Sequence, residues 1–86
     1  MTHQQILWAI NDAAELAARS AFDAFGNDPA AELPTPEMAW SFLETLYADG
    51  EIERPAALPE FMPRQFKHDY HRHLHLISEM HFGVRA

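Results

Sequence analysis

The chain has 86 residues, a net charge of −7 and no cysteine, and 48% of its residues are hydrophobic. This length suits one domain with a modest core, and the hydrophobic content is that of a folded chain. The lack of cysteine excludes disulfides, thiolate metal sites and thiol nucleophiles. We therefore expect a single domain over residues 1–86.

The first predicted helix spans about residues 3–25. Thr2 is placed to be its N-cap, and a glutamine three residues later gives the spacing of a capping box. Gly26 follows as the expected end of the helix. One face is apolar and mostly alanine, which lets a neighbouring helix approach closely. This face consists of Ile6, Ile10, Ala13, Ala17, Ala21 and Ala24. Trp8 and Phe22 are expected to point away from it.

The second predicted helix spans about residues 36–49. Thr35 suits its N-cap, a proline stands at its first position, and Gly50 supplies a left-handed residue at its end. Its apolar residues form two stripes on roughly opposite sides. One stripe is Met38, Phe42 and Leu46, and the other is Trp40, Leu43 and Tyr47. Such a helix is either enclosed by neighbours or covers a core with one stripe and a partner with the other.

The third predicted helix spans about residues 63–82, after a connector in which Ile52 and Leu58 are expected to pack against the core. Its core stripe is Phe66, Tyr70, Leu74 and Ile77, with Met80 and His73 or His81 beside it. Its other side carries Arg64, Lys67, His68, His71, Arg72, His75 and Glu79. Three helices with short to medium connections predict an all-α fold, a small three-helix bundle.

The charges are divided unevenly along the chain. Residues 1–60 hold eleven acidic and two basic side chains, whereas residues 61–86 hold four basic and two acidic side chains and five of the six histidines. The favoured interpretation is that the acidic part attracts the basic last helix during packing. The alternative is an acidic surface that recognises a basic partner.

The histidine-rich stretch of the last helix is a candidate metal or pH-responsive site. Its candidate ligands are His68, His71, His75 and Glu79. Neighbouring members of this set can bring two donors to one ion, but His68 and His75 lie roughly 10 Å apart along the helix axis. Ligands of one zinc must each come within about 2.1 Å of it. A complete zinc site therefore needs ligands from elsewhere, and the favoured interpretation is a solvated face without a cofactor.

Other functions find less support in the sequence. Arg64, Lys67 and Arg72 can contact phosphates, but the acidic remainder of the chain repels a polyanion, so nucleic-acid binding through the last helix is a second alternative that is not favoured. The serines lie within predicted helices and there is no glycine-rich phosphate loop, so we expect no enzymatic activity. No stretch reaches the ~20 apolar residues of a membrane span and no signal peptide is present, so we expect a cytoplasmic protein.

The remaining candidate is a protein-binding surface on the first two helices. Its aromatic residues are of the types that dominate interfaces, and acidic residues would orient a basic or nucleic-acid-binding partner. The candidate residues are Trp8, Glu37, Trp40, Leu43, Glu44 and Tyr47. Two alternatives are a homodimer and a last helix that covers the aromatic stripe. In size and composition, though in no motif, the chain resembles the inhibitors of host complexes that phages encode, including anti-CRISPR proteins.

Overall fold

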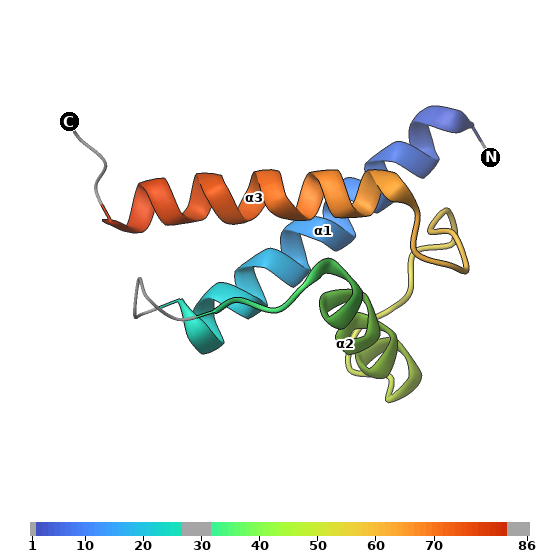
Figure 1. Ribbon diagram of the computed structural model, residues 1–86. Helices are drawn as coiled ribbons and strands as arrows, with labels where there is room; N and C mark the ends of the chain where they lie inside the picture. Colours follow the sequence, from blue (N-terminus) through green and yellow to red (C-terminus); the bar gives the residue numbers. More distant parts are fainter. Residues whose placement is uncertain (1, 27–31, 83–86) are drawn as a thin grey trace.

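The computed structural model describes residues 2–26 and 32–82, and all regular structure within these ranges is helical. The helices are α1 (His3–Phe25), α2 (Pro36–Ala48) and α3 (Arg64–Phe82). Their bounds agree with the predicted ranges to within one residue at each end, and the all-α fold is confirmed (Figure 1). None of these helices is long and apolar enough to cross a bilayer.

Local side-chain hydrogen bonds explain where α1 and α2 begin. Thr2 and Gln5 form the predicted capping box: the Gln5 amide donates to Thr2 Oγ1 at 3.1 Å, and the Thr2 amide donates to Gln5 Oε1 at 2.8 Å. At the start of α2, the Met38 amide donates to Thr35 Oγ1 at 3.2 Å. Each bond satisfies an amide that has no partner inside the helix, so the sequence alone fixes these boundaries.

The two helix-ending glycines act differently. Gly50 has φ 77°, and the amide that follows it, from Glu51, donates to the Leu46 carbonyl at 3.1 Å, as in a Schellman motif. Gly26 caps α1 with φ −84°, so it ends the helix without the left-handed conformation. A Cβ at Gly26 would lie 2.5 Å from Cδ2 of Phe22, and the glycine is therefore needed for close packing.

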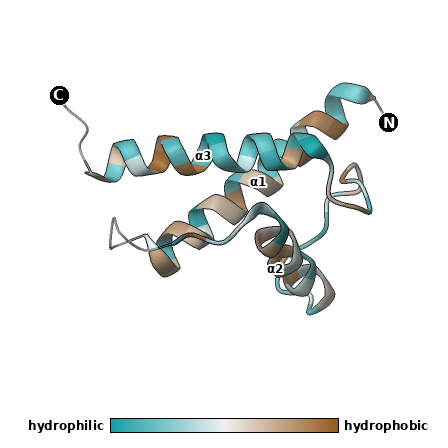
Figure 2. Cartoon of the chain, in the orientation of Figure 1, coloured by the Kyte–Doolittle hydropathy of each residue, from teal (hydrophilic) through white to brown (hydrophobic). Residues whose placement is uncertain are grey.

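The helices are arranged as a pair with a third helix across it. α1 and α3 run in the same direction and form the most extensive contact, while α2 lies against one side of the pair at a steep angle (Figure 1). Figure 2 shows that α3 is the most hydrophilic of the three along its outer side. The connection from α2 to α3 passes around the end of the pair at which α3 begins.

The core is built from small residues on α1 and large ones on α3. Phe66, Tyr70 and Leu43 are the largest fully buried side chains. Six alanines of α1 surround them, namely Ala9, Ala13, Ala14, Ala17, Ala18 and Ala21. This set is wider than the single stripe predicted, because α1 packs against both other helices. Alanine lets both neighbours approach closely without a loss of helix propensity.

The connector and the ends of the core agree with the predicted packing only in part. Leu58 is buried and Ile52 packs against the core, as predicted. Phe22 was expected to point outward but is buried, because it lies on the α3 side of α1, where its ring contacts that of His81 at a centroid distance of 5.0 Å. Met80 was expected beside the core stripe but is 82% exposed, since α3 continues against α1 through Ile77 instead.

Candidate protein-binding groove

The aromatic stripe predicted to bind a partner is largely internal. Trp40 and Leu43 are buried, with relative exposures of 6% and 0%. The Trp40 ring meets Phe66 of α3 edge to face, with centroids 4.9 Å apart and an interplanar angle of 78°. In this structure both residues belong to the core and offer no exposed surface to a partner; Trp40 is covered by Phe66 in the first turn of α3.

Tyr47, at the end of the same stripe, is half-buried. The Arg54 guanidinium lies 5.5 Å from its ring centroid, a cation–π contact within the chain. Burial raises the pKa of the Tyr47 hydroxyl above its usual value, and the positive charge of Arg54 opposes part of that change. The ring is thus already engaged by the connector that follows α2.

The other stripe of α2 faces outward. Met38 is 60% exposed and Phe42 is 48% exposed, whereas Leu46 is half-buried against the core. Phe25, at the end of α1, is 51% exposed. The structure therefore agrees with the alternative in which the last helix covers the aromatic stripe, and it leaves Met38 and Phe42 of the other stripe exposed.

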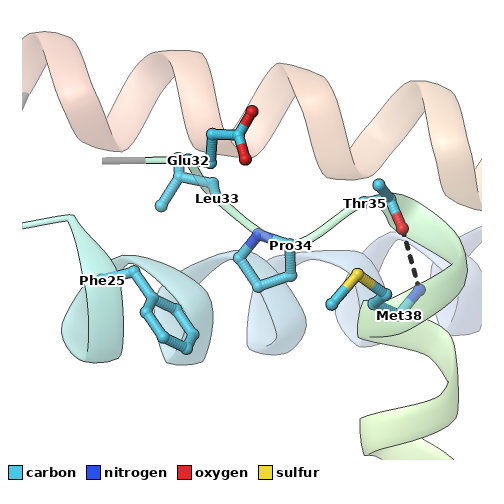
Figure 3. Close-up of a pocket in the computed structure, with 6 residues that line it drawn as sticks. All are labelled: Phe25, Glu32, Leu33, Pro34, Thr35 and Met38. Atoms are coloured by element: carbon cyan, nitrogen blue, oxygen red, sulfur yellow. Dashed lines mark hydrogen bonds between the residues drawn. The ribbon is translucent and has the colours of Figure 1, made fainter. Parts of the chain in front are cut away.

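These exposed residues line a groove between α1 and α2, which we call the α1–α2 groove. Its volume is about 310 Å³, and it is lined by Ala17, Ser20, Ala21, Ala24, Phe25, Pro34, Met38, Ala39 and Phe42. The short side chains on α1 leave room between the two helices, and the larger side chains form the walls. Figure 3 shows Pro34 between Phe25 and Met38, where the groove meets the segment that leads into α2.

One acidic side chain lies beside the groove. Glu32, in the segment before α2, is exposed and lines an adjoining hollow together with Phe25, Pro34 and Met38 (Figure 3), and it forms no ion pair within residues 2–26 and 32–82. Both cations of residues 1–60 are engaged elsewhere. Arg19 pairs with Glu15 at 3.1 Å, and Arg54 donates to the Pro59 carbonyl at 2.6 Å.

The predicted acidic residues Glu37 and Glu44 are exposed, as a rim would require. They flank Ser41 on the polar side of α2, however, and neither lines the groove. At about 100° per residue, this side is turned well away from the Met38–Phe42 stripe. Their negative charge contributes to the field around α2, but the structure does not bring them to the groove itself.

Trp8 is 59% exposed, in agreement with its predicted outward orientation. It lies at the α1–α3 seam, beside a polar cluster that sequence analysis missed. Asp69, although buried, accepts hydrogen bonds from Gln65 at 2.9 Å and Arg72 at 3.3 Å, and Arg72 also donates to Asn11 of α1 at 2.8 Å. This surface shares no lining residue with the α1–α2 groove. Trp8 and the α2 stripe therefore do not form one site.

The histidine face of α3 is partly organised. Nε2 of His75 lies 3.0 Å from Oε1 of Glu79, whereas the His71 ring lies against Tyr70 at a centroid distance of 5.8 Å. His68 is exposed. Across the part of the chain that the structure describes, no three His, Asp or Glu side chains are placed to hold one metal ion. The structure joins one pair of the four candidate ligands, not the whole set.

Comparison of the chain with protein-family models, curated proteins and solved structures found no match.

Proposed function

We propose that the chain acts by binding another protein through the α1–α2 groove. The observation that supports this most directly is the exposure of three large apolar side chains, Phe25, Met38 and Phe42, around one hollow. Single exposed apolar residues are common, but a contiguous group that lines a groove marks an interaction site. Removing these side chains from water on binding supplies the driving force.

The groove favours a partner with one or two apolar anchors and a basic surround. Its lining offers apolar contact, with Ser20 as a polar lining side chain, so it selects for shape and hydrophobicity. The carboxylate of Glu32, which forms no ion pair within residues 2–26 and 32–82, would attract a cationic side chain beside the anchors. An amphipathic helix with basic flanks fits both requirements. The resemblance to phage-encoded inhibitors, which also act by protein binding, stays a prediction.

Nucleic-acid binding through α3 receives less support. Arg72, one of its three basic residues, is already hydrogen-bonded to Asn11 and Asp69. Arg64 and Lys67 remain exposed, but two cations on a chain of net charge −7 give little attraction for a polyanion.

A matched pair of surface variants tests the groove. Phe42 and Leu76 are 48% and 44% exposed, on α2 and α3 respectively, so Phe42→Ser and Leu76→Ser remove similar apolar surface at different places. The immobilised chain is used to capture a partner from lysate of its source cell, and the purified partner is then titrated by calorimetry. We expect Phe42→Ser to weaken binding roughly 30-fold, the value of a hot-spot residue.

Two results support or contradict the proposal directly. Leu76→Ser should bind as the wild type does, and both variants should keep the helical circular-dichroism spectrum. Equal binding by Phe42→Ser and the wild type, or equal loss in both variants, contradicts a role for the groove. A partner bound through the acidic surroundings should also associate more slowly as salt is added.

A further inference from the structure

One pair of side chains on the outer face of α3 has the geometry of half a metal site. Nε2 of His75 and Oε1 of Glu79 lie 3.0 Å apart, and the two side chains are 72% and 43% exposed. Two donors that each lie 2.0–2.1 Å from a tetrahedral zinc are about 3.3 Å from one another. The helix thus already holds an imidazole nitrogen and a carboxylate oxygen close to the separation that zinc requires.

We propose that His75 and Glu79 form a zinc half-site and that a second copy of the chain completes it. Structural zinc sites need four protein ligands, and the described residues place no third ligand beside this pair. A two-fold axis through the ion brings the same pair from the second copy, which gives two imidazoles and two carboxylates. The two carboxylates balance the charge of the zinc. This site is independent of the α1–α2 groove.

Zinc takes the place of the hydrogen between the two side chains. Because the Glu79 carboxylate accepts a hydrogen bond, Nε2 of His75 is the donor at their 3.0 Å separation in the unbound chain. When zinc binds Nε2, the imidazole keeps one proton on Nδ1, so the step needs no oxidant or reductant. Proton exchange with water is sufficient for the change of tautomer.

One cation near the pair is partly neutralised within the chain. Arg72, the cation nearest to His75 in the sequence of α3, already pairs with Asp69, which partly offsets its charge. Lys67 lies two turns before His75 on the same helix. The ring of His71, one turn before His75, packs against Tyr70. His71 is therefore not one of the proposed zinc ligands.

Sedimentation velocity of the full chain with added zinc chloride tests the proposal. We expect a shift from monomer to dimer that saturates at one zinc per two chains and is reversed by EDTA. His75→Ala and Glu79→Gln should abolish the shift. His68→Ala, which removes another exposed histidine from the same helix, should leave it unchanged. Circular dichroism checks that the variants remain helical, as expected for exposed positions.

Zinc affinity, measured by competition with a chromophoric chelator, provides a second readout. We expect Glu79→Gln to weaken it at least tenfold, since changing even an outer partner of a zinc ligand costs about tenfold or more. The proposal is overturned if zinc produces no dimer, if one zinc binds per chain without association, or if the His75→Ala variant dimerises like the wild type.

Discussion

The hydroxyl of Tyr70 donates a hydrogen bond to the backbone carbonyl of Pro34 at 2.8 Å, which ties the middle of α3 to the segment leading into α2. Tyr70 is fully buried, and its ring stacks on Phe66 with an interplanar angle of 10°. Pro34 also lines the α1–α2 groove. One hydrogen bond therefore connects the core to the wall of the candidate binding site.

Replacing Tyr70 by phenylalanine should measure this connection. We expect Tyr70→Phe to lower the free energy of unfolding by about 1–2 kcal/mol, because a hydrogen bond is lost and the carbonyl of Pro34 is left without its partner. Urea denaturation followed by circular dichroism gives the value. Tyr47→Phe is the control, since the described residues supply no hydrogen-bond partner for that hydroxyl, and it should change stability less. Equal effects of the two variants would contradict the role given to the bond.

Stability at high pH should also depend on Tyr70. Burial raises the pKa of its hydroxyl from 10.0 to about 12, because the phenolate is poorly solvated in the core. Between these two pH values, the folded chain keeps a proton that the unfolded chain has lost. The stability from this group is therefore fully present below pH 10 and is lost as the pH rises towards 12.

The Tyr47→Phe variant isolates this titration, because Tyr70 is then the remaining tyrosine. In the folded variant, the absorbance of the Tyr70 phenolate should appear only at a pH well above 10. The free energy of unfolding of the variant should fall over the same pH range. Adding Tyr70→Phe should remove the part of this slope that comes from Tyr70. A slope that is unchanged by Tyr70→Phe would assign the pH dependence to other groups.

The helix boundaries could be predicted because the signals that set them are local. Thr2 and Thr35 each bond an amide three residues later, and Gly50 takes a left-handed conformation at the end of its own helix. None of these interactions depends on how the helices pack. Gly26 differs, because the need for glycine there comes from close packing against Phe22, which a sequence pattern does not show.

The candidate site was harder to predict because it depends on which side of α2 meets the rest of the fold. The sequence contains both stripes, Met38–Phe42–Leu46 and Trp40–Leu43–Tyr47, but it does not say which one α3 covers. The larger aromatic content of the second stripe is compatible with either a binding surface or a core, and in the structure Trp40 and Leu43 of this stripe are core residues. The polar cluster around Asp69 was missed because its partner Arg72 is also bonded to Asn11, 61 residues away.

Truncation of the two tryptophans should change the free energy of unfolding by very different amounts. Trp40→Ala removes a buried indole that contacts Phe66, and we expect a loss of about 3–5 kcal/mol, a large part of the total stability of so small a domain. Trp8→Ala removes an exposed side chain and should change the free energy of unfolding by less than about 1 kcal/mol. Thermal and urea denaturation give both values. A folded and stable Trp40→Ala variant would contradict the packing of α2 against α3.

Alanine and asparagine substitutions should show that Gly26 and Gly50 are needed for different reasons. At Gly26, any Cβ would lie 2.5 Å from Cδ2 and 2.7 Å from the carbonyl oxygen of Phe22, whose ring is buried. Both Gly26→Ala and Gly26→Asn should therefore cost about 1–3 kcal/mol, as overpacked cores do.

At Gly50, a Cβ would meet nothing within 4 Å, and the cost comes from φ 77° alone. Gly50→Ala should therefore lower the free energy of unfolding by about 1–2 kcal/mol, while Gly50→Asn should lower it less, since asparagine tolerates the left-handed region. Urea denaturation of the four variants separates the two causes. If asparagine were as well tolerated at position 26 as at position 50, close packing against Phe22 would not be the reason for glycine there, because asparagine relieves conformational strain but cannot relieve a steric clash.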